Sequence, residues 1–208
     1  MSPWTRFTSA TKATVVAALF VVAFAAPARA AAIIDFSSVG VSGGTITVDS
    51  AGNVFGADIG IDLLTVSGAP MSNGTYDVDK GVLSFDTKQK TISIYGSVLG
   101  VTGTLLSGSI SNFDLQTGLL GFLGVFSATG PDTKNAELLA KLGLPKDTPF
   151  QYFGFSIGFD LTPFNSRQSY NVVSADIVNT QVPEPSTIML LGTGLVGLAG
   201  AARRRFAA

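Results

Sequence analysis

The chain has 208 residues, a formal net charge of −1, and neither cysteine nor histidine. Without these two residue types it has no disulfide, no cysteine nucleophile and no catalytic triad with a histidine base. Residues 31–181 carry 13 acidic and 7 basic side chains, a net charge of −6. They lack the clustered lysine and arginine that neutralise phosphates, so nucleic acid is not an expected partner.

Residues 1–30 have the layout of a secretory signal peptide. Two basic residues precede an apolar run over residues 13–26, and Ala28 and Ala30 supply small residues at the −3 and −1 positions of a cleavage site. We expect cleavage after Ala30 or after Ala32. The alternative is an uncleaved membrane anchor, although the apolar run is shorter than the roughly 20 residues that a spanning helix needs.

Residues 31–181 are predicted to be one β-rich domain, since about 150 residues can enclose a hydrophobic core. Short apolar and β-branched runs alternate with glycine, serine, asparagine and aspartate, as expected for strands and turns. The predicted strands are residues 33–36, 45–48, 59–66, 75–78, 82–85, 91–98, 104–110, 152–161 and 170–178. The polar residues between 82–85 and 92–95 predict an antiparallel hairpin.

One short helix is predicted over residues 133–142. Asp132 or Thr133 can cap its first turn, three leucines share one face, and Gly143 and Pro145 end it. The predicted fold class is therefore all-β, mainly an antiparallel β-sandwich with a jelly-roll-like arrangement as the alternative, with one short helix.

Strict alternation is clearest along residues 152–161. Large apolar side chains (Phe153, Phe155, Ile157, Phe159 and Leu161) fall on one face, and Gly154, Ser156, Gly158 and Asp160 fall on the other. We expect the first face in the core and the second to be nearly free of bulky side chains.

The carboxyl end has three features in a fixed order. Val182-Pro183-Glu184-Pro185 comes first, the uncharged residues 186–202 follow, and Arg203, Arg204 and Arg205 come last. As a helix, the uncharged stretch would span roughly 25 Å, near the short end of what crosses a bilayer. We expect a transmembrane helix whose arginines hold the carboxyl terminus in the cytoplasm.

Together, these ends resemble the PEP-CTERM family of bacterial exported proteins. The resemblance covers the sorting and anchor segment 182–208, about an eighth of the chain. It implies an exosortase-type transpeptidase as a partner. It also implies that residues 31–181 are first held at the inner membrane on the periplasmic side and are then passed to the cell surface or outside the cell.

Residues 31–181 offer few side chains that could bind a metal ion or catalyse a reaction. Asp58, Asp77 and Asp79 are weak candidates for a calcium site, because calcium takes several oxygen ligands, but solvated turn aspartates explain them as well. No other cofactor is expected. A hydrolase would need two aspartates that folding brings together, which the sequence does not show.

Our main functional hypothesis is a non-enzymatic protein of the cell surface, extracellular matrix or biofilm. The alternative is a module that binds extracellular polysaccharide through exposed aromatic rings. Tyr76, Tyr95, Tyr152 and Tyr170 are available for that purpose.

Overall fold

The structure is a computed structural model that describes residues 31–39, 43–119, 122–161, 169–182, 192–195 and 197. The chain divides into two compact units, and the unit Ala30–Val182 contains all of the described strands. We call this unit the body. Of the other unit, residues 192–195 and 197 are described, and they are helical.

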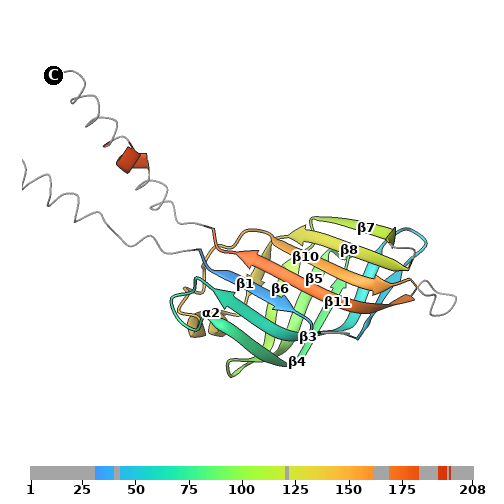
Figure 1. The fold of residues 1–208 in the computed structure, drawn as a ribbon, viewed down its shortest axis with the longest axis horizontal. Coiled ribbons are helices and arrows are strands. Elements are labelled where there is room, and N and C mark those ends of the chain that lie inside the picture. Colours follow the sequence, from blue (N-terminus) through green and yellow to red (C-terminus); the bar gives the residue numbers. More distant parts are fainter. Residues whose placement is uncertain are drawn as a thin grey trace, which may run out of the picture. The chain divides into compact units, whose positions relative to one another are not determined.

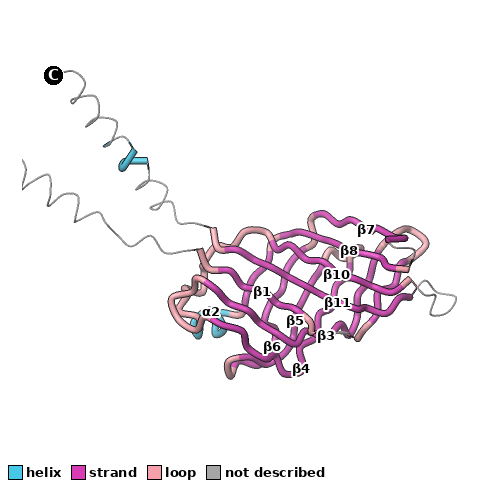
Figure 2. Tube along the Cα trace, in the orientation of Figure 1, coloured by secondary structure: helices cyan, strands magenta, loops and turns pink. Residues whose placement is uncertain are grey.

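The described body consists of eleven strands and one short helix (Figure 2). The strands are β1 (Ile33–Ser37), β2 (Thr45–Val48), β3 (Val54–Ser67), β4 (Gly74–Asp86), β5 (Thr91–Val98), β6 (Val101–Ser109), β7 (Asn112–Leu119), β8 (Leu123–Gly130), β9 (Asp132–Lys134), β10 (Phe153–Asp160) and β11 (Ser169–Thr180), and the helix is α2 (Ala136–Lys141). The prediction of an antiparallel β fold with one short helix is confirmed for these residues.

The strands are hydrogen-bonded into a single sheet. Its order is β7-β8-β10-β11-β1-β3-β4-β5-β6-β9, and β2 pairs with β11 and β3. Figure 1 shows β7, β8, β10, β11 and β1 side by side in one layer, with β5 and β6 crossing behind them. The sheet is therefore folded over so that its two halves face each other.

A cluster of phenylalanines joins the two halves. The ring of Phe85 on β4 stacks on that of Phe126 on β8, with centroids 4.8 Å apart, and meets the edge of Phe155 on β10 at 5.1 Å. All three side chains are buried. Because β4 is far from β8 and β10 in the strand order, these contacts form only when the sheet closes over its own apolar face.

A bent pair of strands connects the halves at one edge. β6 continues into β7 through Ile110 and Ser111, and β8 continues into β9 through Pro131. Across the bend, the amide of Ser109 donates to the carbonyl of Pro131 at 2.9 Å. β6 pairs with β9, and β7 pairs with β8, so one long hairpin belongs to both layers.

The predicted hairpin is confirmed as β4–β5, with Phe85 opposite Ile92. The separate strands predicted at 75–78 and 82–85 are wrong, because β4 runs through both. A register shift between Asp79 and Val82 lets β4 pass the polar residues between the two runs without ending. A Cβ at Gly81 would collide with the carbonyl oxygen of Ile61, so this irregularity requires glycine.

The predicted start of the helix is also wrong. Residues 132–134 form β9 on the edge of β6, and α2 begins after Asn135. The Asn135 side-chain oxygen accepts hydrogen bonds from the amides of Glu137 and Leu138, so Asn135 is the cap in place of Asp132 or Thr133. Pairing with β6 satisfies the backbone that would have formed the first helical turn.

Candidate functional site

The last strand of the body ends beside the start of the first. The amide of Gln181 donates to the carbonyl of Ala32 at 2.7 Å, and the amide of Ala32 donates to the Gln181 side-chain oxygen at 3.1 Å. The amide of Val182 donates to the carbonyl of Pro149 at 2.9 Å. The chain is thus held by hydrogen bonds as far as Val182.

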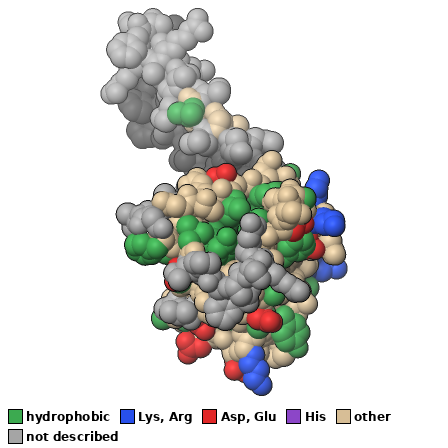
Figure 3. Space-filling view, turned by 90° about the vertical axis from the view of Figure 1, so that its right-hand side faces the viewer, with side chains coloured by type: hydrophobic (Ala, Val, Ile, Leu, Met, Phe, Trp, Pro, Cys, Tyr) green, Lys and Arg blue, Asp and Glu red, His purple; other side chains and the backbone are tan. Residues whose placement is uncertain are grey.

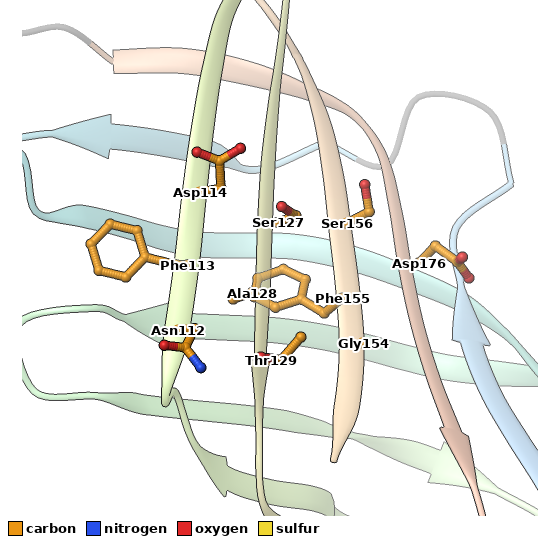
Figure 4. Close-up of a pocket in the computed structure, with 10 residues that line it drawn as sticks. All are labelled: Asn112, Phe113, Asp114, Ser127, Ala128, Thr129, Gly154, Phe155, Ser156 and Asp176. Atoms are coloured by element: carbon orange, nitrogen blue, oxygen red, sulfur yellow. The ribbon is translucent and has the colours of Figure 1, made fainter. Parts of the chain in front are cut away.

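A shallow hollow of about 480 Å³ lies on the outer face of β7, β8, β10 and β11. Its polar side chains come from all four strands: Asn112, Asp114, Ser127, Thr129, Ser156 and Asp176. Figure 4 shows Asp114, Ser127 and Ser156 in a row across β7, β8 and β10. Gly154 leaves open space where a side chain would stand. The strand pairing in this region explains the hollow, because small residues sit opposite each other on the outer face.

Two carboxyl groups meet at the border of this hollow. Asp35 on β1 hydrogen-bonds to Asp176 on β11, and burial, that hydrogen bond and the charge of Asp176 raise the pKa of Asp35 to about 6. The Asp35 Oδ1 atom is buried and has no hydrogen-bond partner among the described residues. Asp35 therefore keeps its proton to a higher pH than an exposed aspartate does.

The sequence did not reveal this pair. Asp35 and Asp176 are far apart in the sequence, near the first and the last residues of the body. Only the pairing of β1 with β11 brings them together. No local spacing signals such a contact, because the register between strands far apart in the chain is set by the whole sheet.

Most of the predicted sorting residues lie outside the described residues. Val182 is described and has an exposed fraction of 37%. Pro183, Glu184, Pro185, Arg203, Arg204 and Arg205 are outside that part of the chain, as are Ala28 and Ala30 at the predicted cleavage site. In the portions of the chain that the structure describes, no helix has the length and apolar character to cross a membrane.

Residues 181–205 match the family model of the PEP-CTERM protein-sorting motif. The chain carries a PEP-CTERM sorting signal. The match begins at Gln181, the residue that pairs with Ala32. It implies an exported protein that is sorted at a membrane with an exosortase as its processing partner. No curated protein and no solved structure matches the chain.

The three aspartates considered for calcium are not brought together in the described part of the chain. Asp77 lies opposite Leu63, and Asp79 lies opposite Ser97. Asp58 has a φ of 55° at an irregular point of β3, where aspartate tolerates the left-handed conformation. Among the described residues, no three acidic side chains are grouped as metal ligands.

The four tyrosines are dispersed. Tyr95 and Tyr152 have exposed fractions of 55% and 62%, whereas Tyr76 and Tyr170 are partly buried. Tyr170 packs on Phe159 with centroids 5.4 Å apart. On the end of the body seen in Figure 3, hydrophobic side chains lie among polar and charged ones. No two described tyrosine rings are in contact as a flat sugar-stacking platform would require.

Proposed function

We propose that this chain is a non-enzymatic, exported protein of the cell surface or extracellular matrix. A signal peptide directs its export, and an exosortase then processes the tail while the body faces the periplasm. The body is afterwards passed to the surface or released. This proposal extends the sorting signal at residues 181–205 to the whole protein.

The position of the motif carries the proposal. The motif begins at Gln181, and the hydrogen bonding of the described body ends one residue later, at Val182. Cutting the chain after Val182 would remove no strand and no described core residue. A tail that can be removed without unfolding the body is what a sorting step with release requires.

The acidic pair gives weak support to an enzyme. Asp35 and Asp176 are in direct hydrogen-bond contact, whereas the carboxyls of retaining glycosidases stand about 5 Å apart. They border an open hollow, and catalytic sites more often enclose their substrates in a cleft. We therefore assign the pair no reaction.

The arginines test the sorting proposal. Neutralising all three, by Arg203→Gln, Arg204→Gln and Arg205→Gln, removes the positive charge that opposes translocation of the carboxyl end. We expect unprocessed protein to accumulate and the surface fraction to fall. Both are measured by cell fractionation and immunoblotting.

A matched control changes charges on the body. Lys88→Gln with Lys146→Gln alters two exposed lysines and should leave sorting as in the wild type. Unchanged processing of the arginine variant would contradict the proposal. So would recovery of the intact wild-type chain from the soluble interior of the cell.

A second candidate function is binding of a neutral polysaccharide, and the hollow favours it. The hydroxyl, amide and carboxylate groups that line the hollow around Gly154 can hydrogen-bond to sugar hydroxyls. Ser156→Tyr would fill the hollow, and Thr102→Tyr places the same side chain at an exposed position on β6. We expect insoluble polysaccharide to retain the wild type and the Thr102 variant but not the Ser156 variant. Equal retention of both variants would exclude the hollow, and no retention of the wild type would exclude the function.

A further inference from the structure

A polar cluster is buried at one end of the core, between β9 and β11. Lys134 and Asp132 have side-chain exposed fractions of 0% and 1%, and Asn179 is 1% exposed. The Lys134 Nζ atom lies 4.0 Å from the centroid of the Phe150 ring. The cluster does not belong to the outer hollow, and the sorting motif does not include it.

Asp132 touches both of the other groups. Lys134 Nζ donates to Asp132 Oδ2 at 2.8 Å and to Oδ1 at 3.1 Å. Asn179 Nδ2 donates to the same Oδ1 atom at 3.1 Å. The amine and the amide therefore lie no more than two hydrogen-bond lengths apart, with one carboxyl group between them.

The surroundings favour the uncharged forms of the lysine and the aspartate. Burial lowers the pKa of Lys134 and raises that of Asp132, although their mutual attraction opposes both shifts. Moving one proton from Nζ to the carboxylate converts the ion pair into a neutral pair, which a poorly solvated site tolerates better. A neutral amine is a nucleophile, and a protonated carboxyl is an acid.

We propose that Lys134 and Asn179 become joined by an intramolecular isopeptide bond, with Asp132 transferring the proton. The neutral Nζ attacks Cγ of Asn179, and a C–N bond forms. The bond from Cγ to Nδ2 breaks, and Nδ2 leaves as ammonia with the proton that Asp132 first took from Nζ. Asp132 then takes the second Nζ proton, so that the new amide nitrogen keeps one hydrogen. A primary amine and a primary amide give a secondary amide and ammonia, so the reaction needs no oxidant, metal or cofactor.

Two features of the site fit this reaction. The Asn179 Oδ1 atom is buried and has no hydrogen-bond partner among the described residues. Half a turn of the amide would present Oδ1 to a protonated Asp132, which would then polarise the carbonyl that is attacked. Phe150 covers the amine and helps to keep water away.

The position of the bond fits the fold. β9 and β11 are not neighbours in the sheet, so the bond would join strands that no hydrogen-bond ladder connects. A chain without cysteine cannot link them by a disulfide. An amide would supply a covalent link that does not depend on redox conditions.

Peptide mapping of the purified, processed protein tests the proposal without knowledge of its exact ends. After denaturation and trypsin digestion, we expect no cleavage after Lys134. A branched peptide should contain both Lys134 and Asn179, with a mass about 17 Da below the sum of its two arms because ammonia has left. Ordinary cleavage after Lys134 together with an unlinked Asn179 peptide would overturn the proposal.

Ammonia can also be lost elsewhere, since an asparagine followed by glycine can cyclise, and Asn73-Gly74 has that sequence. Fragmentation of the branched peptide distinguishes the two cases. A mass loss confined to the peptide that contains Asn73 would count against the isopeptide bond.

Three variants examine the roles of the residues. Lys134→Met removes the amine but keeps an unbranched apolar side chain, Asn179→Leu removes the amide, and Asp132→Asn removes the acid. Each should abolish the branched peptide, whereas Lys141→Met, at an exposed position on α2, should keep it. If a variant fails to fold, the wild-type map still decides. A branched peptide that persists in Asp132→Asn would refute proton transfer by Asp132.

Discussion

Two body aspartates, Asp49 and Asp86, have local structural explanations. An Asp49 carboxylate oxygen accepts hydrogen bonds from the amides of Ala51 and Asn53, and one of Asp86 accepts from Lys88 and Gln89. Both are turn positions, as the preference of aspartate for turns predicts. Asp35 and Asp132 differ, because burial raises the pKa of each carboxyl group and each faces a charged or titratable neighbour.

Asp35 makes the stability of the body depend on pH. Its folded-state pKa of about 6 exceeds the unfolded value of 3.8, so the folded state binds the proton more tightly. The stabilisation is complete at low pH and is lost as the pH rises through about 6. Asp35→Asn stays neutral and should raise the free energy of unfolding at pH 7.5 by on the order of 1 kcal/mol, after discounting for solvent screening.

Thermal melts at pH 4 and pH 7.5 measure this effect. The gain should be small at pH 4, where the wild-type carboxyl is already protonated in the folded state. Asp176→Asn removes the neighbouring charge and should give part of the same gain. If the wild type gained melting temperature relative to Asp35→Asn between pH 4 and pH 7.5, the raised pKa of Asp35 would be contradicted.

Asn135 should contribute to stability as a helix cap. Its side chain accepts from two amides of α2 and donates to the carbonyl of Thr104 at 3.0 Å. Asn135→Ala should cost about 1 kcal/mol or more in the free energy of unfolding, measured by urea denaturation. Thr133→Ala alters an exposed residue of β9 and should have little effect. A larger loss at Thr133 would restore the cap position predicted from sequence.

At the scale of elements, alternation was the most informative sequence signal. In β10, Phe153, Phe155, Ile157 and Phe159 are buried as predicted, and the glycine and serine positions face outward. The sequence did not predict β7, because asparagine, aspartate and glutamine are poor strand formers and β7 is an end strand. Its pairing with β8 determines its conformation.

Phe126 should be among the most sensitive core positions, because it contacts Phe85 on the facing half of the sheet and Phe155 beside it. Phe126→Ala should cost about 3–5 kcal/mol through lost burial and the cavity left behind. In thermal melts this corresponds to a fall on the order of 10 °C. Phe122→Ala, at a side chain with an exposed fraction of 55%, is the matched control and should change little. Equal losses would mean that Phe126 does not join the halves.

The pairing of Ala32 with Gln181 distinguishes the two predicted cleavage positions. Ala32 is fully buried, and its backbone amide and carbonyl both bond to Gln181. Cleavage after Ala30 keeps this pairing, whereas cleavage after Ala32 removes it and leaves Gln181 unsatisfied. We expect amino-terminal sequencing of the exported body to begin at Ala31. A body that begins at Ile33 would contradict this expectation.

At the scale of the whole molecule, local sequence patterns predicted the strand-rich character but not the arrangement of the strands. The β4–β5 hairpin could be predicted because its signals lie within a few residues. The neighbours β11 and β1 come from opposite ends of the body, and no local pattern specifies their register. The same distance in sequence hid the Asp35–Asp176 pair and the contact between Asp132 and Asn179.

The sorting motif was predictable for the opposite reason. All of its signals lie within residues 181–205, in the order in which the chain presents them. What the sequence did not indicate is that β11 runs directly into the motif and is paired with the first strand of the body up to that point.

This adjacency has a mechanical consequence. The strands β1 and β11 are antiparallel, and the two ends of the body lie side by side. A force that pulls these ends apart therefore breaks the hydrogen-bonded pairs between the strands one after another, from Gln181 inward. Such unzipping meets little resistance at each step. A covalent bond at Asn179, two residues inside Gln181, would hold β11 in place and transfer the tension on its end to β9.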